Sequence, residues 1–495
     1  MTSPSSARAG EGARCALRIA GMRSRLIALL LLASFVACAS EPDPLTIQPA
    51  RRRAVAPTDT NAVLDEVEHR TFQWFWDTAD PATRLVPDRW PSVTFSSIAA
   101  VGFGLTAYGI GAERGYVTRE QAADRVLKTL QFFLNAPTGP EATGRTGYKG
   151  FYYHFLYMNS GARYKDVELS TIDTSLLLGG VLFCQSYFDR DNDTERAIRA
   201  AADELYSRAD WSFFLARPPA ISMGWTPEHG PHTYDWRGYN EAMIVIILAL
   251  GSPTHPVDAS AWAEYQKSFR WGTFYGQPHL MFAPLFGHQY SHVWIDFRGI
   301  QDDYMRSHGI DYFENSKRAT IAQRSYAIAN PNGYRDYGPT IWGLSACDGP
   351  MDATITIDGK PRLFYGYAAR GADGTEIRDD GTITPTAAIS SMPFTPDISF
   401  DALQGMRERY GDHLYTKYGF LDAFNATLRT QEKVQAGTVD PQLGWFDVDY
   451  LGIDQGPIIA MIENSRSELV WKTMRKNPHI IRGLKRAGFS GGWLQ

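Results

Sequence analysis

The sequence has little of several features that would point to a particular class of protein. It holds only four cysteines in 495 residues, and their spacing suits neither a zinc site nor a disulfide framework. Its formal net charge is only −5, which does not indicate a nucleic-acid partner. The sequence motifs of a serine nucleophile elbow, a P-loop and a dinucleotide-binding fold are missing as well. These absences argue against a zinc protein, a nucleotide-dependent enzyme and a nucleic-acid-binding protein.

Near the N-terminus, the apolar run is too short for a stable transmembrane helix. It covers residues 26–37 and follows four arginines between residues 14 and 25. A basic segment followed by a short apolar segment is typical of a secretory signal peptide, which we predict for residues 1–37. Cys38 follows Phe-Val-Ala, which is similar to a bacterial lipoprotein cleavage box. We expect a lipid on Cys38, with ordinary cleavage beside it as the alternative.

Residues 38–60 are rich in Pro, Ala and Arg and are predicted to form a flexible tether. No later stretch resembles a linker, so residues 61–495 are predicted to form one domain. Loss of residues 1–37 would remove five arginines and one glutamate and leave a net charge of −9. An acidic, exported protein meets a neutral or cationic substrate more easily than a polyanion. We expect a monomer of the periplasm or cell envelope, without a cofactor, that touches the membrane only through its lipid.

Aromatic residues are plentiful. They make up 13% of the chain and include 13 Trp and 25 Tyr. Such side chains can fill a thick core, but Trp and Tyr also offer flat faces with a polar edge. Sugar rings stack on surfaces of this kind, so the composition favours a carbohydrate ligand.

Helical patterns recur from residue 61 onward. Some of these segments are apolar on every side and others are amphipathic, which predicts an inner helical ring surrounded by an outer ring. We therefore expect an all-α, double-ring helical toroid. Residues 353–385 break the pattern, because two alternating segments flank Asp358-Gly359 and predict a β-hairpin over one mouth of the toroid. The predicted helices cover residues 61–78, 96–112, 118–135, 168–188, 194–208, 238–250, 259–270, 302–327, 385–392, 398–410 and 456–475.

Glu241 is the first candidate for catalysis. It lies at the start of the apolar run Ala242–Leu250, in what we expect to be the first turn of a buried helix. The helix N-terminus would stabilise its charge, whereas burial would raise its pKa. A carboxyl group that titrates near neutrality suits a general acid. The alternative is a carboxylate that only caps its own helix.

A second group of acids lies in the loop that leads into the predicted helix at 456–475. Asp447, Asp449 and Asp454 crowd this loop, and Asp454 comes just before the predicted helix start. Asp454 could cap the helix or point into a cleft. Because Pro457 suits the first helical turn, the helix does not need Asp454 as a cap.

Asp173 repeats the arrangement of Glu241 at the start of the apolar segment 171–184. Its spacing from Ser170 also fits a capping box, which is the structural alternative. Between residues 271 and 297, aromatic residues alternate with histidines. His288 and His292 have the spacing of metal ligands on a helix, with Asp296 as a third. We expect them to be polar groups that line a cleft, and we predict no metal site.

Several longer strings resemble the bacterial glucoamylase-like family that contains the endo-β-1,2-glucanases, and the resemblance covers about residues 61–487. The strings are Ser170-Thr-Ile-Asp-Thr174, Gly238-Tyr-Asn-Glu-Ala-Met243, Leu250-Gly-Ser-Pro-Thr-His-Pro256, His288-Gln-Tyr-Ser-His-Val-Trp-Ile-Asp-Phe-Arg-Gly299, Asp311-Tyr-Phe-Glu-Asn315 and Leu451-Gly-Ile-Asp-Gln-Gly-Pro-Ile458.

The resemblance implies an (α/α)₆ toroid and an inverting hydrolase that releases sophorose or short oligosaccharides from β-1,2-glucan. It places the general acid at Glu241. For the base we select Asp454, with Asp447, Asp449 and Asp173 as further catalytic candidates. Inversion requires acid and base carboxyls about 6.5–9.5 Å apart. Candidate substrate contacts are the aromatic, amide and imidazole groups near these acids: Trp236, Tyr239, Asn240, His288, His292, Trp294, Trp445 and Gln455.

Other functions remain compatible with the same toroid. A polysaccharide lyase would use Tyr, His and Arg around a uronate, and the acidic balance of the chain argues against it. A transglycosylase and a non-catalytic glycan-binding lipoprotein are the remaining alternatives.

Overall fold

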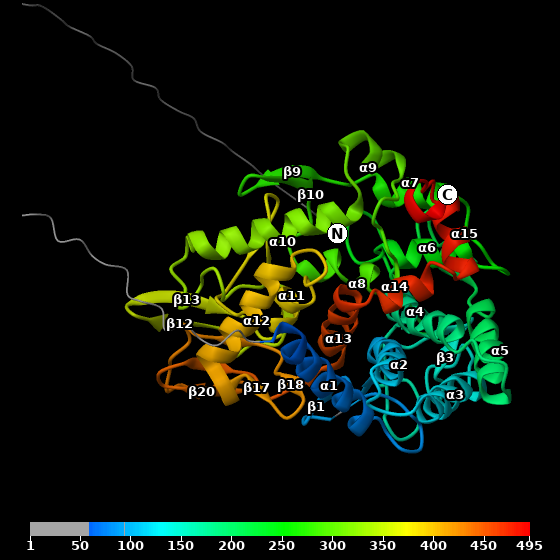
Figure 1. The fold of residues 1–495 in the computed structure, drawn as a ribbon, viewed down its shortest axis with the longest axis horizontal. Coiled ribbons are helices and arrows are strands. Elements are labelled where there is room, and N and C mark those ends of the chain that lie inside the picture. The colour runs from blue at the N-terminus through cyan, green and yellow to red at the C-terminus, as the bar shows by residue number, and fades with distance from the viewer. Residues whose placement is uncertain (1–58, 94) are drawn as a thin grey trace, which may run out of the picture. The chain divides into compact units, whose positions relative to one another are not determined.

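The helices alternate along the chain between two rings, as the sequence predicts. The computed structural model describes residues 59–93 and 95–495, and within them the six inner helices are buried almost completely. Neighbouring inner helices pack on one another around the centre of the toroid (Figure 1). The inner helices are α2 (Ile98–Glu113), α4 (Thr171–Tyr187), α6 (Met243–Gly251), α8 (Tyr290–Trp294), α11 (Pro385–Ile389) and α13 (Gly452–Arg466).

The outer helices bury one face against this ring. In α3, for example, one stripe of apolar side chains packs inward, and Thr118 and Gln121 close a capping box at its start. A last helix that was not predicted, α15 (Pro478–Arg486), packs on α6. The six helices that alternate with the inner ring are α1 (Thr60–Thr78), α3 (Arg119–Asn135), α5 (Asp193–Ser207), α7 (Ser260–Gln266), α10 (Tyr312–Ala329) and α12 (Pro396–Tyr410).

Three predicted helix boundaries are wrong. The helix expected at 302–327 divides into α9 (Asp303–His308) and α10, because Gly309 takes a left-handed conformation and Asp311 caps a new start. The helix expected at 456–475 begins earlier, at Gly452, and divides into α13 and α14 (Leu469–Met474). The helix expected at 238–250 begins only at Met243.

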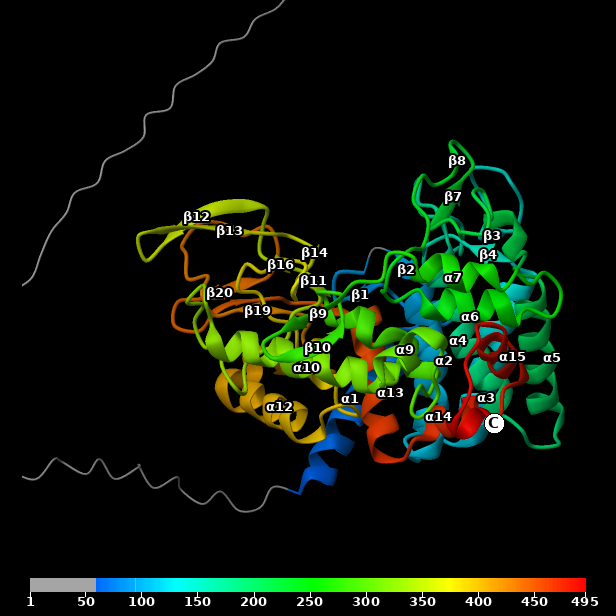
Figure 2. The same ribbon diagram turned by 90° about the horizontal axis from the view of Figure 1, so that it is seen from above.

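Short strands form sheets of two or three strands around the helical ring. In Figure 2 the labelled strands β7, β8, β12 and β13 lie along the upper side, away from the lower ends of the helices. The strands are β1 (Arg89–Trp90), β2 (Ser96–Ser97), β3 (Gly147–Tyr148), β4 (Phe151–Tyr152), β5 (Phe155–Leu156), β6 (Leu169–Ser170), β7 (Gly224–Thr226), β8 (Gly230–Pro231), β9 (Trp271–Phe274), β10 (Gln277–Leu280), β11 (Ala346–Cys347), β12 (Ala353–Ile357), β13 (Lys360–Phe364), β14 (Ala368–Ala369), β15 (Gly371–Ala372), β16 (Ile377–Arg378), β17 (Tyr415–Thr416), β18 (Gly419–Phe420), β19 (Phe424–Asn425), β20 (Thr438–Asp440), β21 (Gly444–Phe446) and β22 (Tyr450–Leu451).

The predicted hairpin is confirmed as β12–β13. Asp358 and Gly359 form its turn with φ of 50° and 74°, which are the left-handed angles of a type I′ turn. A second pair of strands determines which residues lie next to the start of α13. Strand β1 pairs with β22, so that Arg89 lies opposite Leu451 directly before α13.

The described residues belong to one compact unit, Thr58–Gln495. None of the helices in this part of the chain is both long and apolar enough to cross a membrane. The predicted signal peptide at 1–37, Cys38 and nearly all of the predicted tether lie outside the described residues.

Candidate active site

Two adjoining cavities open between the starts of the inner helices. One has a volume of about 180 Å³ and the other about 370 Å³, and His154, Tyr367 and Ile453 line both. The smaller is lined by His154, Ile172, Asp173, Leu176, Glu241, Phe286, Tyr290, Ala346, Tyr367 and Ile453. The larger is lined by Asp88, Arg89, Phe95, Ser97, His154, Phe155, Tyr367, Leu451 and Ile453. Together they form a groove with acids along its wall.

Glu241 lies in the turn before α6 rather than in its first helical turn, and its backbone is held firmly. Ser291 on α8 donates a hydrogen bond from Oγ to the carbonyl of Glu241 at 2.8 Å and accepts one from Ile244 N. The Asn240 side chain accepts a hydrogen bond from Ala242 N at 3.0 Å. Because other groups satisfy these amides, the helix does not use Glu241 as its cap. The carboxyl group is left to line the smaller cavity.

Burial, with a smaller contribution from the negative charge of Asp173, raises the pKa of Glu241 to about 7. Near neutral pH this carboxyl group can therefore hold a proton and donate it to an oxygen in the cavity.

Asp173 faces the same cavity from the first turn of α4. Ser170 Oγ accepts a hydrogen bond from Asp173 N at 3.1 Å, so Ser170 caps the helix, and it donates to Asp173 Oδ2 at 2.5 Å. The other carboxylate oxygen lies 3.4 Å from His154 Nε2. Burial would lower the pKa of His154, but Asp173 and Glu168 raise it to about 9. At neutral pH, His154 is a cation held between two acids.

Asp454 lies inside the first turn of α13 and is 2% exposed, whereas the sequence prediction placed it before the helix. Burial raises its pKa to about 7. Burial and the charge of Asp454 raise the pKa of Asp422 well above the usual range. With both groups ionised, Asp422 Oδ1 and Asp454 Oδ1 would be buried without a donor among the described residues. A proton held mainly by Asp422 and shared with Asp454 satisfies both, and it leaves Asp454 as the proton acceptor of the pair.

Tyr290 lies near both Glu241, in the turn before α6, and Asp454, in α13. It lines the smaller cavity beside Glu241, and burial together with the charges of Asp454 and Glu241 raises the pKa of its phenol well above the usual range. Ile453, which precedes Asp454, lines the same cavity. Glu241 therefore lines the cavity itself, whereas Asp454 is not among the lining residues and adjoins them through Ile453 and Tyr290.

Asp447 and Asp449 lie beside Asp348, where one oxygen from each carboxylate falls within 4.8 Å of the others. Arg89 donates to Asp348 Oδ2 at 2.6 Å and to Asp88 Oδ2 at 3.1 Å. These acids form a second cluster next to the Asp422–Asp454 pair rather than part of it.

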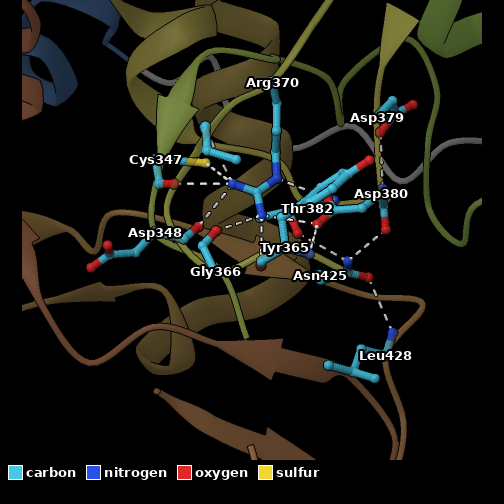
Figure 3. Close-up of polar contacts among 12 residues, drawn as sticks. Cys347, Asp348, Tyr365, Gly366, Arg370, Asp379, Asp380, Thr382, Asn425 and Leu428 are labelled. Carbon is cyan, nitrogen blue, oxygen red and sulfur yellow. Dashed lines mark hydrogen bonds and ion pairs between the residues drawn. The ribbon is translucent and has the colours of Figure 1, made fainter. Parts of the chain in front are cut away.

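Arg370 organises the loops that carry Tyr367 and Asp348. Its guanidinium is fully buried and forms an ion pair with Asp380 at 2.8 Å. It also donates to the carbonyls of Cys347 and Tyr365, both at 3.0 Å, as Figure 3 shows. A charged group that is buried and fully hydrogen-bonded holds its neighbours in one arrangement.

Several predicted substrate contacts do not line these cavities. His288 and His292 are fully buried and lie next to Phe282 O and Ser316 Oγ, at 3.0 and 3.1 Å. Asp296, the suggested third metal ligand, instead forms ion pairs with Arg298 and Arg475.

The remaining predicted contacts are held by other parts of the fold. The indole groups of Trp236, Trp294 and Trp445 donate to Thr171 Oγ1, Thr106 Oγ1 and Ala436 O. Gln455 donates to Phe420 O, and Tyr239 packs on Tyr312. Asn240 positions the turn beside Glu241. All six are at least nine-tenths buried, so their role in this structure is support of the site.

Sequence reasoning missed most residues that line or adjoin the groove, among them the polar residues Asp88, Arg89, His154, Asp348, Tyr367 and Asp422. They come from loops and strand ends that lack helical periodicity, so their patterns gave no local signal. Tyr367 is the exception, because it lies within the segment 353–385 that was predicted to form the hairpin.

The chain resembles known proteins along most of its length. Residues 233–478 match a family model described as "Putative glucoamylase". A crystal structure from Bacteroides uniformis described in the same words is 34% identical, covers 88% of this chain and 99% of its own, and superposes with a TM-score of 0.76. The endo-β-1,2-glucanase of Chitinophaga pinensis, solved with sophorotriose and glucose, is 30% identical with a TM-score of 0.74, covering 88% and 100%.

A curated relative from Parabacteroides distasonis, an exo β-1,2-glucooligosaccharide sophorohydrolase acting at the non-reducing end, is 29% identical over 464 residues. The match covers 87% of this chain and 58% of the relative, so the chain spans little more than half of that protein's length. The shared ring of helices and the identity across full-length structures lead to one conclusion. The chain belongs to the bacterial glucoamylase-like family, whose (α/α)₆ toroid it adopts.

Proposed function

We propose that this protein is a glycoside hydrolase that cleaves β-1,2-glucan with inversion at the anomeric carbon. Glu241 protonates the glycosidic oxygen, and Asp454 activates the attacking water directly or through a sugar hydroxyl. The observation that carries the proposal is a cavity lined by Glu241, with Asp454 next to its lining residues Ile453 and Tyr290, and a pKa of about 7 for both carboxyl groups. Such a pair provides one acid and one base near neutral pH.

The surroundings of the pair suit a neutral sugar chain. Tyr367 is 59% exposed and lines both cavities, so its ring offers a face for a pyranose to stack on. Phe95 and Phe155 add apolar surface in the larger cavity, and Asp88 and Arg89 add hydrogen-bonding groups. The linkage itself comes from the relatives, since β-1,2-glucan and its oligosaccharides are in the names of the proteins from Chitinophaga and Parabacteroides.

A lyase is the alternative that the groove itself raises, because His154, Arg89 and Tyr367 are residues that such enzymes use. Here His154 is engaged by Glu168 and Asp173, and Arg89 by Asp88 and Asp348. A uronate carboxylate would meet these acids, which disfavours its binding.

The decisive experiment is incubation of the protein with β-1,2-, β-1,3-, β-1,4- and α-1,4-glucans, followed by product sizing and NMR of the first anomer released. We expect α-configured sophorose or short oligosaccharides from β-1,2-glucan alone. Glu241→Gln should lower kcat by about 10²–10⁴-fold, since general acid catalysis contributes that much. An ultraviolet-absorbing unsaturated product would show a lyase. Longer products than the substrate would show a transglycosylase, and full activity of Glu241→Gln would refute the assigned acid.

We propose further that the protein is exported and held at the cell envelope by a lipid on Cys38. The sequence of residues 1–38 supports this. Fractionation of cells that produce the wild type or Cys38→Ser tests it. Loss of membrane association in the variant supports the anchor, and equal association of both proteins contradicts it.

A further inference from the structure

Asp348, Asp447 and Asp449 bring three carboxylates together at the edge of the groove. They come from the loop after β11 and from the connection between β21 and β22, and each is at most 6% exposed. One oxygen from each lies within 4.8 Å of the others. Like charges at this separation repel strongly when buried, so the cluster needs a positive partner or protons.

Within the described part of the chain, hydrogen bonds reach only one oxygen of each carboxylate. Asp348 Oδ2 accepts from Arg89 Nη1 at 2.6 Å, and Asp449 Oδ1 accepts from Ser92 N at 2.8 Å. Asp447 Oδ1 accepts from Val448 N at 2.7 Å. Asp447 Oδ2 is buried and has no hydrogen-bond donor among residues 59–93 and 95–495. A buried carboxylate oxygen without a donor costs free energy, and such an exception in a folded protein calls for an ion, a proton or an ordered water.

The charges around the cluster leave it negative. Among residues 59–93 and 95–495, Arg89 is the cation that contacts the cluster, and it also forms an ion pair with Asp88. Arg370 is held by Asp380, and its guanidinium meets only the backbone carbonyl of Asp348, at 3.4 Å. Asp422 and Asp454 add further acid on the side of α13. One arginine therefore cannot balance the three carboxylates.

The ligand set and its dimensions suit a hard divalent cation. Carboxylate oxygens are the ligands that Ca²⁺ and Mg²⁺ prefer. Oxygens on opposite sides of Ca²⁺ lie about 4.6–5.2 Å apart because its bonds are about 2.3–2.6 Å long, whereas around Mg²⁺ they lie about 4.0–4.2 Å apart. An upper limit of 4.8 Å admits both ions, and we choose Ca²⁺ because its flexible coordination tolerates ligands from separate loops, whereas Mg²⁺ demands near-ideal octahedral geometry.

We propose that Asp348, Asp447 and Asp449 bind one Ca²⁺ ion at the edge of the groove. The ion joins the loop after β11 to the segment that leads through β22 into α13. Because Asp454 lies in the first turn of α13, the ion also steadies the segment that carries it. Its role is structural, and its binding does not depend on which glycosidic linkage the protein cleaves.

The test uses the purified protein after treatment with EDTA, titrated with CaCl₂ and, separately, with MgCl₂. Calorimetry should show one Ca²⁺ per chain, and thermal unfolding should show Tm rising by several degrees with Ca²⁺. Asp447→Asn and Asp449→Asn should each weaken Ca²⁺ binding by at least about tenfold and abolish the Tm shift. Asp412→Asn, an exposed aspartate outside the cluster, is the matched control and should keep it.

A folding control is built into the variants. In EDTA, Asp447→Asn should unfold at the same Tm as the wild type or higher, because it removes one repelling charge. A lower Tm in EDTA together with a retained Ca²⁺ shift would overturn the proposal. So would equal stabilisation by Mg²⁺, which would reject the assignment to calcium. Absence of binding by either ion would show that the cluster holds protons only.

Discussion

At the scale of single residues, the neighbours of each ionisable group in and beside the cavity set its protonation state. Glu241 and Asp454 both have a pKa of about 7, but Asp173 raises the first and the hydrogen bond from Asp422 lowers the second. His154 lies between Asp173 and Glu168 and stays protonated. Burial supplies the common shift, and the particular neighbour of each group decides which one holds the proton.

Glu241 should lower the stability of the protein as the pH rises. Its pKa moves from 4.5 to about 7 on folding, so the folded state binds the proton more tightly than the unfolded state. The free energy of unfolding therefore falls between pH 4.5 and about 7, by at most about 3.4 kcal/mol at 1.36 kcal/mol for each pKa unit. Glu241→Gln should remove this loss and be more stable than the wild type at pH 8, but not at pH 4. Urea unfolding of both proteins at pH 4 and pH 8 measures this stability difference. A difference that is the same at both pH values would contradict the prediction.

At the scale of elements, glycines set the distance between the inner helices α2 and α4. A Cβ on Gly180 would lie 2.0 Å from Gly102 O, and one on Gly102 would lie 2.2 Å from Leu176 O. No side chain fits there, so the two helices can pack this closely only with glycine at both positions. Since α4 carries Asp173 and Leu176 into the cavity, this packing also places one wall of the site.

Gly180→Ala should therefore separate α2 from α4 and destabilise the protein by about 1–3 kcal/mol, the usual cost of overpacking a core. Gly338→Ala is the matched control, because the nearest atom to its Cβ is 3.8 Å away and its φ is not left-handed. Urea unfolding of both variants measures the effect. Equal stability of the two would show that the helices can separate without cost.

At the scale of the whole molecule, buried ion pairs join the first helix of the ring to the last inner helix. Glu68 on α1 is fully buried and pairs with Arg466 on α13. Arg114, at the end of α2, donates to Glu463 on α13 at 2.6 Å and lies 3.9 Å from Glu68. These contacts close the toroid between its two ends.

Arg466→Met should destabilise the protein by up to about 3–5 kcal/mol, because it removes the main partner of buried Glu68, whose pKa burial and Glu463 already raise. The double variant Glu68→Gln with Arg466→Met should recover most of the loss, since it removes the unpaired charge. A double-mutant cycle, measured by denaturant unfolding, gives the coupling free energy between Glu68 and Arg466. Equal losses in the single and double variants would mean that the pair does not close the ring.

Much of the architecture follows from local pattern. The continuous apolar run at 242–250 suits a helix that is surrounded by protein. The amphipathic run at 119–134 suits a helix with one face exposed to solvent. Asp358-Gly359 determines a tight turn by its conformational preference. The double ring and the hairpin could therefore be predicted, together with the place of Glu241 and Asp173 at the mouths of buried helices.

The composition of the site could not be predicted in the same way. Tertiary structure decided that Trp294 and Trp445 fill the core while Tyr367 faces the groove, because an abundance of aromatics does not say which of them are inside. It also decided that Asp422 shares a proton with Asp454 and that Asp348 joins Asp447 and Asp449. These groups lie on segments far apart in the chain. Periodicity in a sequence reports whether a side chain is buried, but only the closed ring decides which charges become neighbours.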